Sequence, residues 1–229
     1  MTFADRVLDF HFRHLQPDWR LPPGVDLLYP YDDPETRRCM RAFYGKYLAD
    51  GHERTLVVGI NSGRFGAGVT GVPFTGPKML RERCGIDHAF TSRPELSSDF
   101  VWRWVEAMGG PEAFFADFYI GSVCPLGFVR DGKNYNYYDS KALERAVLPH
   151  IIDNFERLLS FGCHRAQLLV LGEGKNYKFM RALNAERGWF GEVVPLAHPR
   201  YVMQYKRKHL ATYLADYVAK SQAALVANT

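Results

Sequence analysis

Three polar residues, Asn61, Ser122 and His198, stand at the ends of apolar runs that predict buried β-strands. The first of these runs, residues 56–60, is short and rich in β-branched side chains, as strands covered on both faces are. Ligands of open α/β sheets gather at the carboxyl ends of the strands. An amide, a hydroxyl and an imidazole meeting at that edge predict a hydrogen-bonding ligand site. Taken singly, Asn61 also suits a turn before glycine, and His198 suits a surface position before a proline turn.

A glycine-dense loop follows the first predicted strand. Residues 59–76 contain six glycines, which let the backbone turn sharply and approach a ligand closely. Phe65 and Phe74 lie among these glycines, although a fully solvated loop has little use for aromatic side chains. We therefore expect the loop to line the site, the alternative being a plain surface loop. Phe74 also suits a place in the core beneath the loop.

Predicted helices alternate with the predicted strands. Strands are expected at residues 56–60, 118–124, 166–171 and 190–196, and helices at residues 2–16, 34–50, 77–85, 97–108, 140–161, 175–188 and 207–225. The proline-rich residues 16–34 are expected to be extended and residues 131–139 to form a long loop. This alternation predicts an α/β fold of three layers, α/β/α, around a central four-stranded parallel sheet.

Length and composition limit the possible classes of protein. No linker divides the 229 residues, so we expect a single domain, 1–229, with the helix and extended segment of residues 1–34 packed on it. A chain with 47% hydrophobic and 24% charged residues can bury a core, which argues against disorder. Asp5 and Arg6 interrupt the N-terminus, so it does not resemble a signal peptide, and no stretch reaches membrane-spanning length. We expect a cytoplasmic protein with no membrane partner.

The cysteines give no sign of a metal centre. Cys39, Cys84, Cys124 and Cys163 lie far apart and lack the spacing of a zinc or iron–sulfur site. We therefore expect reduced thiols, no metal and no cofactor.

The charge favours a polyanionic partner. The net charge is +4, and the run Lys206-Arg207-Lys208 is predicted to begin a helix, where positive charge opposes the helix macrodipole. A bound phosphate would compensate for that charge, whereas a solvated charged patch is the alternative.

The glycine loop carries a recognisable motif. Gly59-Ile-Asn-Ser-Gly-Arg-Phe-Gly66, followed after three residues by Thr70-Gly-Val-Pro-Phe74, resembles at identical spacing the first motif of the single-strand-selective monofunctional uracil-DNA glycosylases. That motif reads Gly-Met-Asn-Pro-Gly-Pro-Phe-Gly and then Thr-Gly-Val-Pro-Phe-Gly. Ser122-Val-Cys-Pro-Leu126 is similar to the family's Asn-His-Cys-Pro-Leu, and His198-Pro199 to the start of its His-Pro-Ser-Pro-Arg. The resemblance runs from about residue 35 to the C-terminus and looks most like a divergent bacterial branch.

This resemblance implies an enzyme of the uracil-DNA glycosylase superfamily. It would flip uracil or another deaminated base out of DNA and hydrolyse its N-glycosidic bond, without a lyase step. By resemblance, Asn61 positions the attacking water and His198 donates a hydrogen bond to uracil O2 as the base leaves. The implied base-binding residues are Ile60, Gly63, Phe65, Phe74 and Ser122, with Phe74 stacking on the base.

One departure concerns base selection. The family has asparagine at the position of Ser122, which reads the O4 and N3 atoms of uracil, whereas serine has one hydroxyl on a shorter arm. We therefore expect weaker discrimination for uracil or a preference shifted toward other deaminated bases.

The implied partner is DNA, single- or double-stranded, bound by a monomer. The expected DNA contacts are Arg64, Arg200, Tyr201, Met203, Lys206, Arg207 and Lys208, with Tyr201 or Met203 as the wedge that fills the gap left by the flipped nucleotide. Two other functions stay open. The chain would otherwise be a non-catalytic nucleic-acid-binding module that keeps the glycosylase fold, or a hydrolase of free nucleosides.

Overall fold

The computed structural model describes residues 1–228, which group into two compact units. The first unit comprises Met1–Gly51, Ile60–Pro94 and Ser122–Gly162, and the second comprises His52–Gly59, Glu95–Gly121 and Cys163–Thr229. The single domain expected for the whole chain stays a prediction. Across residues 1–228, no helix combines the length and the apolar character needed to cross a membrane.

A four-stranded parallel sheet dominates the second unit. Its strands are β2 (Thr55–Gly59), β3 (Phe118–Ser122), β6 (Gln167–Leu171) and β7 (Glu192–Leu196), in the order β3-β2-β6-β7. Every residue of β2 is buried, as expected for an inner strand covered on both faces. All four strands overlap the predicted apolar runs, and the α/β fold class is confirmed.

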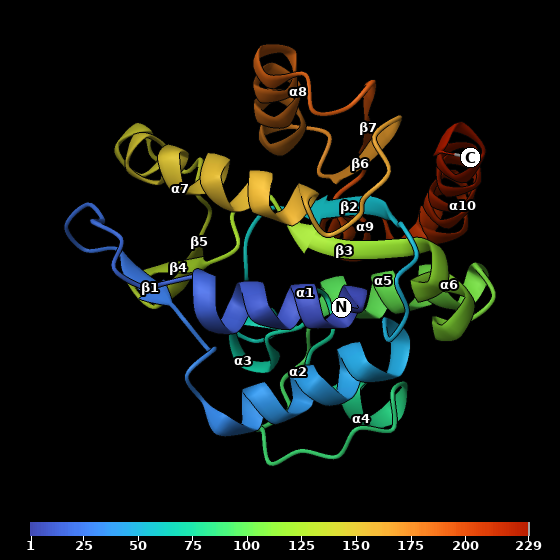
Figure 1. Ribbon diagram of the computed structural model, residues 1–229, viewed down its shortest axis with the longest axis horizontal. Coiled ribbons are helices and arrows are strands. Elements are labelled where there is room, and N and C mark those ends of the chain that lie inside the picture. The colour runs from blue at the N-terminus through green and yellow to red at the C-terminus, as the bar shows by residue number, and fades with distance from the viewer. Residues whose placement is uncertain (229) are drawn as a thin grey trace. The chain divides into compact units, whose positions relative to one another are not determined.

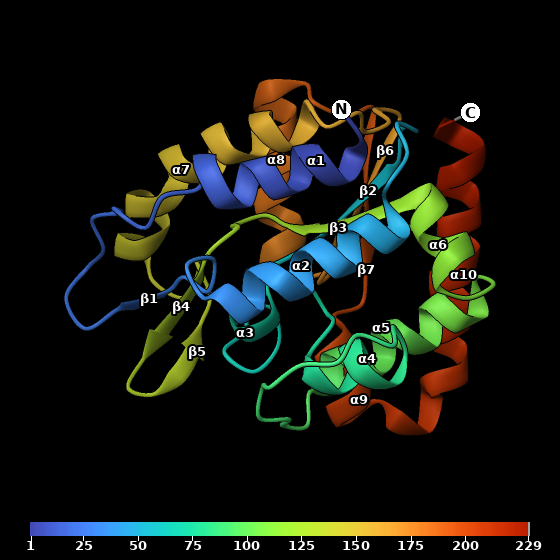
Figure 2. The same ribbon diagram turned by 60° about the horizontal axis from the view of Figure 1, so that its bottom comes forward.

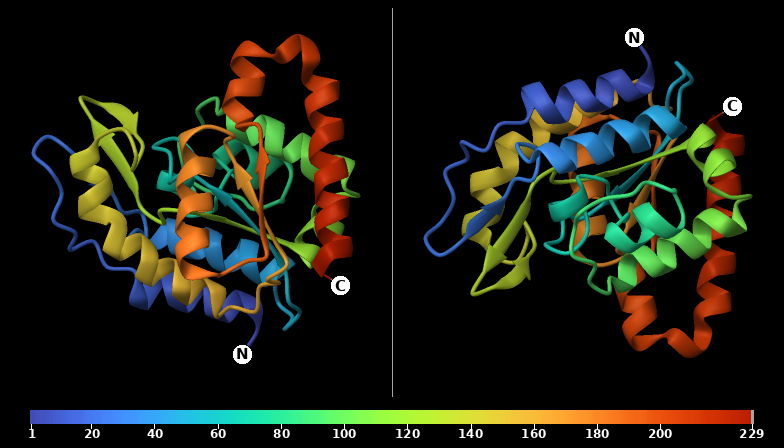
Figure 3. Two further views of the ribbon diagram at one scale, coloured as in Figure 1. Left: turned by 90° about the horizontal axis from the view of Figure 1, so that it is seen from above. Right: turned by 90° about the horizontal axis from the view of Figure 1, so that it is seen from below.

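Helices cover both faces of this sheet. Within the second unit, α8 and α10 pack on opposite sides of β6 and β7 (Figures 1 and 3). The helices of this unit are α5 (Leu96–Ala107), α6 (Pro111–Asp117), α8 (Lys175–Arg187), α9 (Pro199–Tyr205) and α10 (Leu210–Asn228). The helices α6 and α9 were not predicted, although each begins with a proline at its first position, which favours a helix start.

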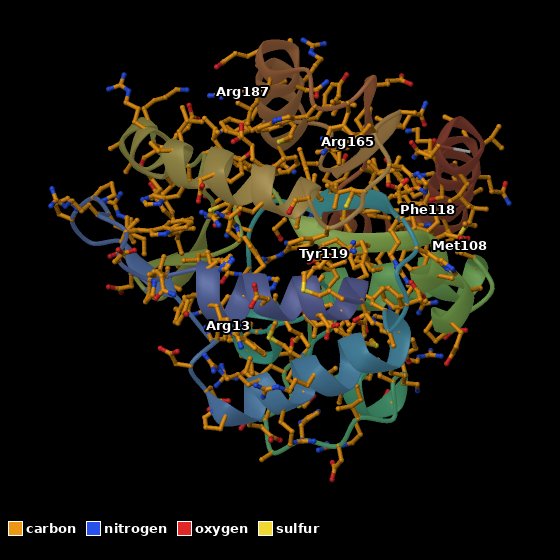
Figure 4. The ribbon with its side chains drawn as sticks, in the orientation of Figure 1. Arg13, Met108, Phe118, Tyr119, Arg165 and Arg187 are labelled. Carbon is orange, nitrogen blue, oxygen red and sulfur yellow. The ribbon has the colours of Figure 1, made fainter. Side chains whose placement is uncertain are left out.

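An aromatic cluster joins α5, α6 and the start of β3. Phe118, labelled in Figure 4, stacks on Phe114 with ring centroids 4.9 Å apart. The indole of Trp104 meets Phe114 edge to face at 4.8 Å, and its Nε1–H donates to the Ser221 hydroxyl at 3.1 Å. The buried indole therefore has a hydrogen-bond partner as well as aromatic contacts.

Asparagine side chains bind both ends of the β2–β6 strand pair. At the amino ends, Asn228 Oδ1 accepts from the N–H groups of Ala166 (3.0 Å) and Gln167 (3.2 Å), and its Nδ2 donates to Thr55 Oγ1 (3.1 Å). At the carboxyl ends, Nδ2 of the buried Asn176 donates to the carbonyls of Leu171 (3.0 Å) and Gly59 (3.4 Å). Two helices on opposite faces thus fasten the same two strands.

The helices of the first unit largely follow the predicted pattern. They are α1 (Phe3–Asp9), the π-helical turn η1 (Phe10–His14), α2 (Pro34–Tyr47), α3 (Ala67–Thr70), α4 (Pro77–Glu82) and α7 (Lys141–Leu159). The predicted start of α2 is confirmed, because the Asp33 side chain caps it by accepting from the Thr36 N–H at 2.7 Å. The N-terminal helix packs against α2, where the Ala4 N–H donates to the Leu48 carbonyl at 2.9 Å.

A small antiparallel sheet of the first unit was not predicted. It consists of β1 (Asp26–Leu28), β4 (Gly127–Arg130) and β5 (Lys133–Tyr135), in the order β1-β4-β5 (Figure 2). The extended segment before α2 supplies β1, and the expected loop 131–139 begins with a hairpin instead. Asp131 and Gly132 turn that hairpin with φ angles of 50° and 66°, the left-handed pair that an Asp-Gly dipeptide favours.

The Asn228 contact leads to a test of stability. Asn228→Ala removes the side-chain acceptor of the Ala166 and Gln167 N–H groups, which water can partly replace at the exposed Ala166, so we expect the free energy of unfolding to fall by about 1 kcal/mol. Urea denaturation measures this change. Gln222→Ala, an exposed amide on the same helix, is the control and should stay within about 0.5 kcal/mol of the parent. Equal losses in both variants would contradict the prediction.

Candidate active site

The parallel sheet directs the chain toward the predicted site residues. β2 ends at Gly59 and β7 ends at Leu196, so Asn61 and His198 each follow a carboxyl end by two residues. Ser122 is itself the last residue of β3. In topology, all three residues therefore occupy the positions where α/β proteins carry their ligand-binding groups.

Within the first unit, the backbone after β5 holds the side chain of Asn61. Its Oδ1 accepts from the Tyr137 N–H at 3.2 Å, and its Nδ2 donates to the carbonyls of Tyr135 and Ser62 at 3.4 Å each. An N–H can only donate, so the amide oxygen must face Tyr137. Because a carbonyl oxygen has two lone pairs, Oδ1 keeps one with which to accept a hydrogen bond from water.

The glycine loop is packed tightly against the turn that follows β3. The Ile60 carbonyl, directly after β2, accepts a hydrogen bond from the Cys124 N–H, two residues after β3, at 3.0 Å. This bond joins the two segments just beyond the ends of their strands. A Cβ atom at Gly127 would lie 2.2 Å from the Ser62 carbonyl oxygen, so only glycine fits there. The loop beside Asn61 therefore has little freedom to shift.

The predicted stacking residue Phe74 has an unusual backbone conformation. Its φ angle is 53°, a left-handed conformation that costs a bulky residue about 1–2 kcal/mol. The hydroxyl of the buried Thr70 donates to the Thr75 carbonyl at 2.8 Å and stabilises this turn. The ring is half-buried and stacks on no other aromatic ring of residues 1–228. Strained residues held in this way concentrate at binding sites.

Phe65 lies between cationic side chains. The guanidinium carbons of Arg64 and Arg93 lie 4.4 Å and 5.0 Å from the centre of its ring. Arg64 also donates from its guanidinium to the Gly132 carbonyl and from its backbone N–H to Asn134 Oδ1 at 3.1 Å. The predicted base-binding role of Phe65 stays a prediction. Arg93 was not predicted and carries no motif that would have revealed it.

His198 caps α9 in the second unit. Its Nδ1 accepts from the backbone N–H of Arg200 at 3.2 Å, so Nδ1 has no proton and the neutral ring has its hydrogen on Nε2. The Tyr217 hydroxyl holds the preceding residue by donating to the Ala197 carbonyl. Gly172, whose φ of 113° favours glycine, lies beside the imidazole.

The surroundings of His198 keep it neutral. Burial, and secondly the positive charge of Arg200, lower the pKa of His198 to about 4. At neutral pH the ring is therefore an uncharged donor through Nε2–H. A positioned neutral donor stabilises negative charge that develops on a substrate oxygen.

Ser122 is the site residue at which this chain differs from the asparagine of the resembled motif. Its side chain is half-buried, and its hydroxyl makes no hydrogen bond with any of the residues that the structure describes. A lone hydroxyl can donate one hydrogen bond and accept others, but it cannot match a donor and an acceptor on one base edge as an amide does.

The surface of α9 corrects one prediction. Met203 is only 6% exposed and packs in the core together with Val202, so it cannot serve as a wedge without leaving that core. Tyr201 and Tyr205 are 41% and 68% exposed, with ring centroids 5.9 Å apart. Tyr205 was not predicted, although its four-residue spacing from Tyr201 places the two rings on one face of a helix.

The basic run also lies differently from its prediction. Lys206 is the C-cap that follows α9, and Arg207 and Lys208 belong to the 3₁₀ turn η2 (Arg207–His209), whereas α10 begins only at Leu210. The run therefore sits in a turn between two helices, and not in the first turn of the last helix. Arg207 and Lys208 are exposed and form no ion pair with any residue of the described chain.

Comparison with known proteins decides the family. The model of the uracil DNA glycosylase superfamily matches residues 46–222, a span that contains Asn61, Ser122 and His198. The chain belongs to the uracil-DNA glycosylase superfamily. It is 30% identical over 212 residues to the single-strand selective monofunctional uracil-DNA glycosylase of Rattus norvegicus, covering 79% of this chain and 70% of that protein. The Mus musculus protein of the same name is 28% identical over the same shares of both chains.

A solved structure agrees with this membership. The crystal structure of wild-type SMUG2 from Pedobacter heparinus superposes with a TM-score of 0.93 at 43% sequence identity, covering 97% of this chain and 98% of that one. The family resemblance and the α/β fold inferred from the sequence are confirmed. The individual roles of the site residues stay predictions for this glycosylase-family chain.

The lowered pKa of His198 predicts a pH dependence of stability. The pKa rises from about 4 in the folded protein to about 6.5 in the unfolded chain, which therefore binds a proton that the folded protein does not. The free energy of unfolding should fall as the pH is lowered from about 6.5 to about 4. His198→Asn keeps a capping oxygen and removes the titration, so we expect a flatter dependence in urea denaturation between pH 7 and pH 5.

His209→Asn, on the exposed turn η2, is the matched control and should keep the parental slope. Some slope should remain in His198→Asn, because burial also lowers the pKa of His11 to about 4. Parallel profiles for His198→Asn and the parent would contradict the assignment.

Proposed function

We propose that this protein is a monofunctional DNA glycosylase that removes uracil and other deaminated bases from DNA. The observation that supports this proposal is the state of His198, a neutral histidine whose Nδ1 is occupied by the Arg200 N–H and whose Nε2–H is the remaining donor. Membership of the uracil-DNA glycosylase superfamily supports the proposal that the N-glycosidic bond between base and deoxyribose is the bond that is broken.

The proposed reaction is hydrolytic. The oxygen of a water molecule bonds to C1′ of the deoxyribose while the bond between C1′ and the base nitrogen breaks. The electron pair of that bond leaves with the base, and positive charge builds on the sugar. Once its oxygen is bonded to C1′, the water gives up a proton that ends on the departed base, so the products are the neutral base and an abasic site. Asn61 would orient the water through the free lone pair of Oδ1. An amide is a poor base, so most of the rate enhancement must come from stabilising the departing anion.

His198 would stabilise that anion. Its Nε2–H donates to the base oxygen on which negative charge grows, O2 in the case of uracil. A donor that is already oriented needs no reorganisation when the charge appears, and removal of such a donor typically slows a reaction about 10²–10³-fold. The neutral ring acts in this way across neutral pH because the pKa of His198 is about 4.

The base would be bound after it is flipped out of the DNA stack. Phe74 supplies a half-buried ring for stacking, and backbone groups of Ile60 and Gly63 supply hydrogen bonds to the base edge. Phe65 would border the same base. Ser122 meets the edge that a family asparagine reads, and its single hydroxyl favours a broader choice of base.

We propose a DNA-binding surface on α9 and η2. Arg200, Lys206, Arg207 and Lys208 would contact phosphates, with Arg64 contributing from the glycine loop. The exposed Tyr201 would fill the gap left by the flipped nucleotide, and Tyr205, one helical turn further on, would stack on a neighbouring base.

The absence of a lyase step is part of the proposal. A lyase needs an amine that forms a Schiff base with the sugar, and the residues at the catalytic positions, Asn61 and His198, have none. Lys175 is the lysine to check, because it begins α8 at the carboxyl end of β6.

The first test follows abasic-site formation in a uracil-containing oligonucleotide under single-turnover conditions. We expect His198→Ala to slow base release about 10²–10³-fold and Asn61→Ala to slow it about 10²-fold, because each loses a positioned hydrogen-bonding group. Lys175→Ala should match the parent, and borohydride should trap no covalent adduct.

Equal activity in the parent, Asn61→Ala and His198→Ala would remove this mechanism. DNA binding without base release would favour the non-catalytic module, and turnover of free uridine would favour a nucleoside hydrolase.

The second test concerns the choice of base. The parent should release xanthine or hypoxanthine as well as uracil from matched oligonucleotides. Ser122→Asn should raise the rate for uracil relative to the purines about tenfold or more, since one well-placed hydrogen-bonding pair is worth about 1–3 kcal/mol. Ser122→Ala is the control and should not favour uracil. A strict uracil preference that is unchanged in both variants would refute this account of Ser122.

A further inference from the structure

The orientation of the Asn61 amide depends on a segment distant in the sequence. The contact that selects one of the two possible amide orientations is the hydrogen bond from the Tyr137 N–H to Asn61 Oδ1. These two residues are 76 positions apart in the sequence. If the amide were rotated by 180°, its NH₂ group would face the Tyr137 N–H, and its oxygen would face the carbonyls of Ser62 and Tyr135. Such an arrangement leaves donors against donors and acceptors against acceptors.

The backbone that provides this selection is itself held in a short turn. The Asn136 N–H donates to Asp139 Oδ2 at 2.8 Å, and the Asp139 N–H donates to the Asn136 carbonyl at 2.9 Å. Tyr137 lies inside this closed turn, and its side chain is fully buried. The Asp139 carboxylate thus closes the turn that contains the Tyr137 N–H.

Both ends of the segment are anchored. On one side, Asn134 Oδ1 accepts from the Arg64 N–H in the glycine loop at 3.1 Å. On the other side, the Ser140 hydroxyl caps α7 by accepting from the Leu143 N–H at 3.1 Å. The turn is thus fixed between the loop that carries Asn61 and the start of a long helix.

We propose that Asp139 is a positioning residue for Asn61. Its carboxylate holds the turn 136–139 so that the Tyr137 N–H keeps the Asn61 oxygen in the orientation that binds the attacking water. This inference rests on the proposed role of Asn61 in base excision. The family motif that contains Asn61 says nothing of Asp139, which lies 78 residues later in the chain.

A double-mutant cycle tests this inference. We expect Asp139→Ala to slow single-turnover base release about tenfold, because the amide loses its preferred orientation, and to leave the dissociation constant for the oligonucleotide unchanged. In the Asn61→Ala background, the same change should have no further effect. An equal fold-loss in both backgrounds would overturn the inference, because it would show that Asp139 does not act through Asn61.

Matched variants separate positioning from general disruption. Asp139→Asn keeps an oxygen acceptor for the Asn136 N–H and should restore the rate to within about twofold of the parent. Asp131→Asn removes an exposed negative charge from the turn of the same hairpin, where Asp131 pairs only loosely with Arg130 at 3.9 Å, and should leave the rate unchanged because asparagine also tolerates the left-handed φ of 50°. If Asp139→Ala does not fold, Asp139→Glu keeps the charge and displaces the acceptor, and it takes the place of the alanine variant in the cycle.

A spectroscopic readout is independent of catalysis. The side-chain amide signals of Asn61 in a ¹⁵N–¹H spectrum are identified by their absence in Asn61→Ala. They should shift in Asp139→Ala and stay in place in Asp131→Asn. Unshifted signals in Asp139→Ala would overturn the inference. Shifted signals together with equal activity of the parent and Asn61→Ala would support the positioning and refute the proposed function.

Discussion

The pairing of β2 with β6 is the contact that fixes the strand ends from which candidate site residues follow. β2 leads to Asn61, and β6 leads to Gly172, which lies beside the His198 ring. Asn176 joins the two strands at this end, and Asn228 joins them at the other. A buried amide between two strand ends replaces the hydrogen bonds that the strands lose where they diverge. The divergence therefore occurs at a defined residue, and both loops start from fixed points.

The two candidate catalytic side chains share a chemical ambiguity. An asparagine amide can present either its oxygen or its nitrogen, and a neutral imidazole can carry its proton on either nitrogen. In each case one backbone N–H resolves the ambiguity, that of Tyr137 for Asn61 and that of Arg200 for His198. The protein thus uses main-chain donors, which cannot change their protonation or orientation easily, to assign one acceptor role and one donor role.

The sequence alone predicted those parts of the structure that depend on neighbouring residues, such as apolar runs, helix caps and motif spacing. Buried apolar runs located all four strands of the parallel sheet, the Asp33 cap located the start of α2, and the spacing of the glycine loop identified the family. The hairpin β4–β5 was missed although its Asp131-Gly132 turn was readable, because the tyrosines around it suggested a loop. The burial of Met203 was missed because its helix, α9, was missed. The orientation of Asn61 was beyond any local pattern, since its partner is 76 residues away.

The long separation between Asn61 and Tyr137 has a consequence for protein synthesis. A chain that leaves the ribosome from its amino end exposes the glycine loop well before the residue that orients its asparagine has been added. His198 follows 61 residues after Tyr137. Nascent chains therefore carry the family motif before the backbone contacts that orient Asn61 and His198 can form.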